Sequence, residues 1–204
     1  MSVLHPPEPH LAQPRLPRPR AAVAADIDEL IRLLGRLLGP PSGSGSGGAP
    51  APYRATGPEQ ERAWRESYRR WLGKWLEAED GPVLVVVVRE PATGCSDPGR
   101  RKLLACATAV VDERAPSPVC LSGRAGWIQS VVVDPAARGQ GLGTAIVRYA
   151  LRRLKDQGAD EVFLQTTPEA NRLYRRAGFA PTGEDLLFKV LDTPLDPTAK
   201  ETSR

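Results

Sequence analysis

The sequence predicts an α/β protein with a mixed central sheet and helices on both faces of that sheet. Segments rich in β-branched residues alternate with segments whose apolar residues recur every three or four positions, the spacing of one helix face. The run 83–88 is apolar throughout, as expected of a central strand covered on both faces. Another β-branched run, 131–133, leads through a glycine-rich loop into a helical pattern. The 204 residues, 41% of them hydrophobic, fit one domain with tails, and we place the domain at 19–191.

The first part of the chain is predicted to contain a tail, a strand and a helix. Residues 1–18 are rich in proline and should be disordered. A short strand is expected at 19–23, and Asp26 is placed to cap the helix that follows. That helix has one apolar face, and its polar face holds few cations, which favours core packing over a membrane surface. The apolar face consists of Ile27, Leu30, Ile31, Leu34, Leu37 and Leu38.

A loop and a second helix come next. The segment 39–58 is rich in glycine and serine, and we expect a flexible loop inside the domain, because too little chain precedes it to form a core. A helix is predicted over 58–79, with Pro58 in its first turn. Its aromatic stripe either packs on the sheet or lines a cleft for an apolar or cationic substrate. The stripe consists of Trp64, Tyr68, Trp71, Leu72, Trp75 and Leu76.

The rest of the chain alternates between strands and helices. Strands are expected at 83–88, 103–111, 127–133, 161–166 and 186–191. One helix is expected from Leu142 until Gly158 ends it. Another begins at Pro168 after a Thr167 cap and stops at Gly178. Turns or loops are expected at 91–99 and 114–126, and a polar tail at 192–204.

The composition excludes several classes of site. The net charge is +4, and much of the basic excess lies in the N-terminal tail, so we expect no nucleic-acid-binding surface. Both histidines, His5 and His10, lie in the same tail. The domain therefore offers no Ser-His-Asp triad, Cys-His pair or histidine zinc site, and no metal is expected.

The cysteines and the hydropathy pattern indicate a cytoplasmic protein. The chain has an odd number of cysteines and no Cys-x-x-Cys pair, as expected of reduced thiols. The three are Cys95, Cys106 and Cys120. No apolar run approaches the ~20 residues of a membrane span, so no membrane partner is expected. The N-terminus also lacks the apolar core of a signal peptide.

The stretch 131–144 organises the predicted site. A β-branched strand ends at an Asp-Pro break, and a loop then carries the chain to a helix N-terminus. The first-turn amides of a helix lack partners within it and its dipole favours negative charge, so this place suits an anion. The loop is neither a Walker A loop, because no lysine follows, nor a dinucleotide fingerprint, because the third glycine is missing. Its cation and glycines are Arg138, Gly139, Gly141 and Gly143.

Two motifs together resemble one family. Arg-x-x-Gly-x-Gly, from Arg138 to Gly143 and preceded by Val-x-Pro, is similar to the coenzyme A pyrophosphate loop of the Gcn5-related N-acetyltransferases, the GNAT superfamily. The segment 168–179 resembles the Ala-x-x-Leu-Tyr and Gly-Phe pattern of the same family. The residues that match this second pattern are Ala170, Leu173, Tyr174, Gly178 and Phe179.

The resemblance, which covers about residues 19–191, implies a fold and a reaction. The fold would be a GNAT-type sheet whose strands splay apart at the coenzyme site. Acetyl-CoA would be the co-substrate, and a primary amine of a small molecule, peptide or protein would attack the thioester directly. A homodimer is one option that the resemblance leaves open.

The resemblance also implies roles for individual residues. The backbone of 131–133 would pair with the pantetheine arm and offer an N–H to the thioester oxygen. Loop amides would hold the pyrophosphate. Tyr174 would be the catalytic residue that protonates the departing thiolate. The coenzyme-binding residues would be Val131, Val132, Val133, Arg138, Gly139, Gln140, Gly141, Leu142, Gly143 and Thr144. Asn171 is added as a further coenzyme contact because it lies three residues before Tyr174 on the same helix, although the usual asparagine position of the family holds Thr167 here.

The sequence leaves open which group acts as the general base, and it also leaves two other functions open. Histone-acetylating members carry a glutamate where this chain has Trp127, and Gln129 on the same face accepts no proton. Asp112 and Glu113, at the end of the neighbouring strand, are candidate bases, and a water relay is equally open. The main alternative function is a non-catalytic acyl-CoA-binding or regulatory module. Acetyl transfer to aminoacyl-tRNA is a third, which the weak basic excess disfavours.

Overall fold

The computed structural model describes residues 17–40, 53–78, 81–91 and 101–187. The predictions that lie wholly or largely outside these ranges are the tail 1–18, the loop 39–58, the turn 91–99, the strand 186–191 and the tail 192–204. Leu186 and Leu187, the described part of the last predicted strand, are exposed and form no strand.

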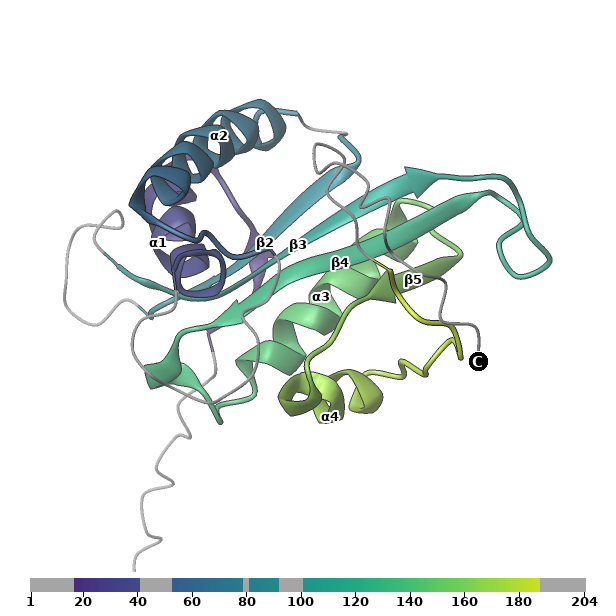
Figure 1. Ribbon diagram of the computed structural model, residues 1–204. Coiled ribbons are helices and arrows are strands. Elements are labelled where there is room, and N and C mark those ends of the chain that lie inside the picture. Colours follow the sequence, from purple (N-terminus) through teal and green to yellow (C-terminus); the bar gives the residue numbers. More distant parts are fainter. Residues whose placement is uncertain (1–16, 41–52, 79–80, 92–100, 188–204) are drawn as a thin grey trace, which may run out of the picture.

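Within the described ranges, five strands form one mixed sheet in the order β1-β2-β3-β4-β5 (Figure 1). The first four strands pair antiparallel with their neighbours, and β5 pairs parallel with β4. Because the β3–β4 ladder continues as far as Glu113 and Arg124, β4 begins before the predicted position 127. The strands are β1 (Arg20–Ala21), β2 (Val83–Arg89), β3 (Leu103–Glu113), β4 (Arg124–Val133) and β5 (Glu161–Leu164).

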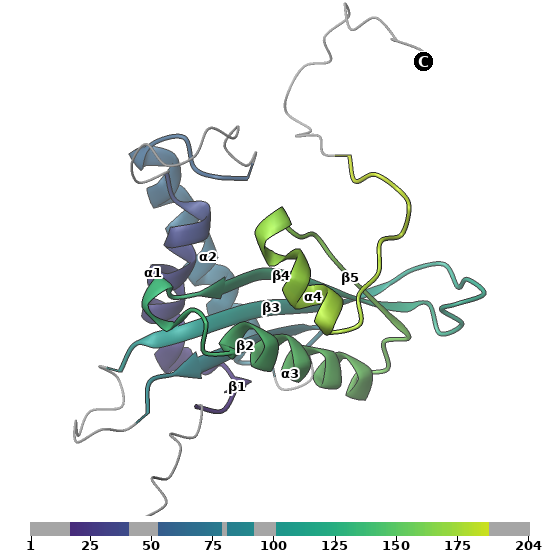
Figure 2. The same ribbon diagram turned by 90° about the horizontal axis from the view of Figure 1, so that it is seen from below.

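Helices cover both faces of the sheet, which confirms the predicted α/β architecture. The helices α1 and α2 lie on one face, and α3 and α4 lie on the other (Figures 1 and 2). A short 3-10 turn, Ala24–Asp26, precedes α1, and another, Pro135–Ala137, lies between β4 and α3. The helices are α1 (Ile27–Leu38), α2 (Pro58–Leu76), α3 (Leu142–Asp156) and α4 (Pro168–Arg176).

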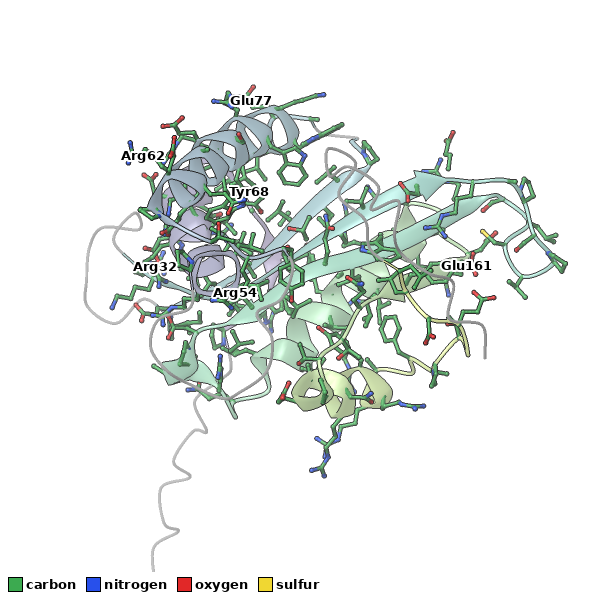
Figure 3. The ribbon with its side chains drawn as sticks, in the orientation of Figure 1. Arg32, Arg54, Arg62, Tyr68, Glu77 and Glu161 are labelled. Carbon is green, nitrogen blue, oxygen red and sulfur yellow. The ribbon has the colours of Figure 1, made fainter. Side chains whose placement is uncertain are left out.

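Both faces of β2 are buried, which explains its uninterrupted apolar sequence. Val86 and Val88 belong to the core shared with α3, whereas Val85 and Val87 belong to the core under α1 and α2. In the second core the α2 rings pack in series: the centroid of Tyr68 lies 5.8 Å from that of Trp64 and 5.5 Å from that of Trp71. Figure 3 labels Tyr68 on this side of the molecule. Five of the six residues of the predicted stripe therefore pack in the core against the sheet, namely Trp64, Tyr68, Trp71, Leu72 and Leu76.

Asp26 does not cap α1 with its side chain, contrary to the prediction. Its carboxylate is fully buried and accepts hydrogen bonds from Arg20 at 2.7 Å, from Arg89 at 2.5 Å and from the amide of Val23 at 2.9 Å. Burial alone would raise the pKa of Asp26, but these hydrogen bonds outweigh it and hold the pKa below its usual value. The carboxylate thus ties β1, β2 and the start of α1 together.

The cap predicted for α4 is also different. Thr167 occupies the N-cap position, but its side chain makes no capping hydrogen bond. The backbone amide of Glu169 and the Thr167 hydroxyl favour the charged form of the Glu169 carboxylate and hold its pKa below the usual value. Glu169 in the first turn places a negative charge at the positive end of the helix dipole.

The strands β4 and β5 separate half-way along β4. Their parallel ladder ends at the pair Ile128 and Leu164, so the rest of β4 has no partner in β5. Near the same point β4 contains a bulge: the register with β3 shifts by one residue, and Ser130 has a φ of 55°. The predicted splay of two parallel strands is therefore present, and it leaves the backbone of 131–133 facing a gap.

Candidate active site

Two cavities meet at the separated ends of β4 and β5. The first, the loop cavity, has a volume of about 730 Å³ and is lined by the end of β4, the glycine loop, the start of α3 and one side of α4. The second, the splay cavity, has a volume of about 500 Å³ and lies between the separated strands, beside the end of α1. Both volumes are in the range of small-molecule sites.

The loop between β4 and α3 presents unpaired amides to the loop cavity. The first backbone hydrogen bond of α3 runs from the Ala145 amide to the Gly141 carbonyl, at 3.0 Å. The amides of Leu142, Gly143 and Thr144 therefore have no partner inside the helix. They stand at the positive end of the helix dipole. The geometry suits an anionic group such as a phosphate.

Two glycines of this loop are required for different reasons. Gly141 is the N-cap of α3 and has a φ of +78°, a conformation that side chains with a Cβ rarely adopt. A Cβ on Gly143 would lie 2.6 Å from the Cδ1 atom of Leu173 on α4. Gly141 thus shapes the loop, whereas Gly143 lets α4 approach α3.

The rim of the loop cavity is basic. Four arginine side chains come from three separate elements, and Glu169 is the carboxylate that lines the cavity among the described residues. One of these arginines, on α1, also lies 3.4 Å from Asp134 at the end of β4. The four are Arg36 from α1, Arg138 from the loop, and Arg172 and Arg176 from α4.

Nine of the eleven predicted coenzyme-binding residues line the loop cavity; Gln140 and Asn171 are not among its lining residues. Asn171 is exposed on α4 and its Oδ1 atom accepts from Arg175 at 3.4 Å. The buried stripe of α4 contains Ala170, Leu173 and Tyr174, which turns position 171 toward solvent. Spacing to Tyr174 along the helix was therefore a poor guide to the direction of Asn171.

Tyr174 lies where the two cavities join. It lines both of them, as do Val131 and Thr167. Its ring is 7% exposed and stands edge-on to Phe179, with centroids 6.0 Å apart. Burial raises the pKa of the Tyr174 phenol, so the hydroxyl keeps its proton at neutral pH.

The splay cavity is assembled from side chains that are distant in the sequence. Leu37 and Leu38 come from the end of α1, Tyr53 from the segment before α2, and Gln165 from the chain after β5. None of these four belongs to a motif. Leu37 and Leu38 are predicted only as core residues of the first helix, and the sequence gives no signal for Tyr53 or Gln165 as site residues. Trp127 and Gln129, which the sequence analysis did single out, line this cavity as well.

The two predicted base candidates do not reach either cavity. Glu113 lies 3.4 Å from Arg124, and Asp112 lies 3.5 Å from Arg114. These pairs stand at the end of β3 that pairs with the start of β4, whereas the cavities lie at the other end of β4. The structure therefore does not support Asp112 or Glu113 as a general base.

The family comparison agrees with this fold and site. The model of the acetyltransferase (GNAT) family matches residues 51–179, which include the glycine loop, Tyr174 and all of β2 to α4. The chain belongs to this family. The resemblance inferred from the two motifs is thereby confirmed.

Relatives with curated names are acetyltransferases. Glucosamine 6-phosphate N-acetyltransferase 1 of Oryza sativa subsp. japonica is 36% identical over 122 residues, 60% of this chain and 65% of that protein. Mycothiol acetyltransferase of Cellulomonas flavigena is 38% identical over 90 residues, 35% of this chain and 26% of that protein. The chain thus spans less than two thirds of the length of these relatives.

Solved structures share the fold over most of the chain. Glucosamine-6-phosphate N-acetyltransferase from Arabidopsis thaliana superposes with a TM-score of 0.59 and 22% identity, covering 86% of this chain and 98% of that one. A predicted acetyltransferase with acetyl-CoA from Clostridium acetobutylicum gives a TM-score of 0.62 and 17% identity, covering 86% and 97%. At these identities the likeness concerns the fold.

The described residues contain neither a candidate membrane span nor a candidate metal-binding cluster. None of the described helices combines the length and the apolar character that crossing a bilayer requires. In the same part of the chain, no three side chains among histidine, cysteine, aspartate and glutamate cluster as metal ligands would.

Proposed function

We propose that the protein is an acetyl-CoA-dependent N-acetyltransferase that acts on a primary amine of a small molecule, peptide or protein. The observation that carries the proposal is the junction of the two cavities at Tyr174. One cavity has the groups that bind a diphosphate, and the other is open to an acceptor. A thioester held along β4 would lie between them.

The loop cavity fits coenzyme A in three respects. The unpaired amides at the start of α3 suit the diphosphate, and the four arginines at the rim supply positive charge for the phosphates. The β4 backbone at 131–133, free of a β5 partner, offers hydrogen-bonding groups that a pantetheine amide can pair with. Family membership supports the same ligand.

Tyr174 is the proposed proton donor. When an amine attacks a thioester, the new bond joins nitrogen to the acyl carbon, the carbon–sulfur bond breaks, and a thiolate leaves. The phenol gives its proton to that sulfur. The attacking nitrogen, which is positively charged in the tetrahedral intermediate, loses a proton to solvent to give the neutral amide, and solvent returns a proton to the phenolate. Its raised pKa keeps the proton available, and its place at the junction of the cavities suits this task.

The function is tested by binding and turnover measured separately. Calorimetric titration with acetyl-CoA should give a saturable heat, and thiol release should exceed the amine-free rate for at least one member of an amine panel. A folded sample that shows neither thermal shift nor heat with millimolar acetyl-CoA would contradict the proposal.

A non-catalytic acyl-CoA-binding module is the second candidate. Its support is the absence of a carboxylate among the described residues that line the splay cavity. Such a module would bind acetyl-CoA and release no coenzyme A with any amine. The turnover arm of the same experiment therefore separates the two functions.

The remaining proposals concern context. The domain is proposed to span 19–191, since both hydrophobic cores lie inside these limits. A cytoplasmic location is proposed because Cys106 and Cys120 are free thiols, as in proteins of reducing compartments. Size-exclusion chromatography with light scattering would decide whether the protein is a homodimer.

A further inference from the structure

We propose that the acceptor is an amine already uncharged at neutral pH and attached to a flat, uncharged, apolar body, as in an aromatic amine. This inference rests on the proposed function, because it assigns the splay cavity to the acceptor. It differs from the substrate in the names of the glucosamine 6-phosphate relatives, whose acceptor carries both an alkyl amine and a phosphate. Three observations support it: the neutral lining, the place of the nearby charges, and the aromatic wall.

No described side chain that lines the splay cavity is an acid or a base of the Asp, Glu, Lys or Arg type. Its polar groups are the amides of Gln129 and Gln165, hydroxyls such as that of Ser130, and the phenols of Tyr53 and Tyr174. The other lining residues are apolar or aromatic. Such a lining gives an ammonium group no counter-ion and a phosphate no cation.

The charges on α1 and before α2 are engaged elsewhere. Arg54, next to Tyr53, donates to the Gly39 carbonyl at 3.1 Å. Glu29 and Arg32 on α1 pair with each other at 2.9 Å, and Asp28 pairs with Arg69 of α2 at 2.7 Å. None of these groups lines the splay cavity.

The charged side chains on β5 and α4 also lie outside the splay cavity. Figure 3 places Glu161, at the start of β5, at the end of the sheet opposite Arg54 and Arg32. The α4 residues Glu169 and Arg172 line the loop cavity and not the splay cavity. Cys106 of β3 is fully buried, and burial raises its pKa to about 12, so this thiol is a poor proton acceptor.

Because the lining of the splay cavity is uncharged, the chemistry of acyl transfer favours an acceptor whose amine is already uncharged. Only the uncharged form of an amine can attack, and a lysine-like amine with a pKa near 10.4 is uncharged in roughly one molecule in 2,500 at pH 7. Bringing its ammonium form into an apolar site without a partner costs several kcal/mol in order of magnitude. An aromatic amine, whose lone pair is delocalised into the ring, avoids both costs.

The wall of the cavity suits a flat ring. The indole of Trp127 stacks on the ring of Phe163, with centroids 6.3 Å apart and planes inclined by 25°. The guanidinium of Arg114 lies over the Phe163 ring, 4.9 Å from its centroid. The stack holds the indole in a fixed orientation, so Trp127 is assigned as a specificity-determining residue that contacts the acceptor ring.

The first test compares two isomers, 4-methylaniline and benzylamine, which share a benzene ring but differ in amine charge at pH 7. For the protein saturated with acetyl-CoA, kcat/KM for 4-methylaniline should exceed that for benzylamine by about 10-fold or more, and glucosamine 6-phosphate should not react. A higher kcat/KM for benzylamine or for the sugar phosphate would overturn the inference.

If no amine reacts, the proposed function fails, and calorimetry on the coenzyme A complex then decides the inference. Tighter binding of 4-methylaniline than of benzylamine supports it, and equal or weaker binding overturns it.

Two variants test the neutral lining and the ring contact. Gln129→Glu introduces a carboxylate of nearly the same shape, and it should raise kcat/KM for benzylamine by about 100-fold, the low end of what a positioned base contributes. Trp127→Ala should raise KM for 4-methylaniline several-fold and leave acetyl-CoA affinity unchanged. The matched control is Trp75→Ala, which removes an indole of α2 that lines neither cavity. An unchanged benzylamine rate in Gln129→Glu, or equal effects of the two tryptophan variants on KM, would contradict the inference.

Discussion

The loop cavity and the splay cavity are built in different ways, although both are lined by Leu37, Val131, Thr167, Ala170 and Tyr174. The loop cavity consists mainly of one continuous stretch whose backbone amides, glycines and helix end do the binding that we propose. The splay cavity is made of side chains from five places along the chain. A site made by the backbone is visible in a short motif, whereas a site made by distant side chains becomes visible only in the folded protein.

The largest expected effect is the loss of acetyl-CoA binding when the glycine loop that lines the loop cavity is changed. Gly141→Val places a β-branched residue at a φ of +78° and a side chain in the loop cavity, so acetyl-CoA binding should fall below calorimetric detection. Gly158→Val is the matched control, because Gly158 follows the other end of α3 with a φ of +82°. It should lower the Tm and keep the affinity. Wild-type affinity in Gly141→Val would disprove our placement of the diphosphate.

The second prediction tests Tyr174, one of the residues that line both cavities. Tyr174→Phe removes the hydroxyl and keeps the edge-on contact with Phe179, so kcat should fall about 100-fold while the affinity for acetyl-CoA changes less than threefold. Pre-steady-state thiol release would measure this change in the chemical step. A rate equal to that of the wild type would remove Tyr174 from the mechanism.

The third prediction concerns α1, which supplies Leu37 and Leu38 to the splay cavity and begins next to the buried Asp26. Asp26→Asn removes the buried carboxylate charge that pairs with Arg20 and Arg89, and it should lower the free energy of unfolding by about 2 kcal/mol at pH 7. Urea unfolding would measure the difference.

The pH dependence of this effect has a definite sign. The pKa of Asp26 is lower in the folded than in the unfolded chain, so its contribution is present above the unfolded value, near 3.9, and is lost as the pH falls through the folded pKa. The stability gap between wild type and Asp26→Asn should therefore close below pH 4. A gap that stays constant down to pH 2 would show that the carboxylate charge is not responsible.

The smallest effect tests the basic rim of the loop cavity. Arg138 is exposed, so Arg138→Ala should weaken acetyl-CoA binding only several-fold, and the loss should shrink as salt rises from 50 to 500 mM, as screening of surface charge requires. Lys155→Ala, at the far end of α3, is a matched control that should leave the affinity unchanged at every salt concentration. A salt-independent loss in Arg138→Ala would instead indicate a change in loop structure.

Much of the fold followed from local patterns. The predicted helices 27–38 and 58–79 and the strands 83–88 and 103–111 match α1, α2, β2 and β3 closely, because apolar spacing and residues such as Pro58 act within one element. The predictions that failed depend on neighbours. Asp26 turned away from the α1 amides toward Arg20 and Arg89, which no local pattern reveals. The Thr167 side chain makes no capping hydrogen bond either, because the rotamer of a threonine is set by its surroundings and not by its position before a helix.

The candidate site divides in the same way. Loop residues such as Gly141 and the α4 residue Tyr174 could be selected from two motifs, and both line the loop cavity. Asn171 could not be oriented, because its direction depends on which side of α4 packs against α3. The bulge at Ser130 could not be predicted, because no glycine marks the position in the sequence. The left-handed φ of Ser130 accompanies the pairing of β4 with β3.

The sequence by itself determined the layered α/β fold and the anion-binding loop, because helix periodicity, helix ends and glycine conformations are properties of short segments. Only the tertiary structure decided where β4 leaves β5, which side chains enclose the splay cavity, and that its described lining carries no formal charge. These features arise from contacts between residues far apart in the chain. The free energy of such contacts depends on packing and on the removal of water, which spacing along a sequence does not record.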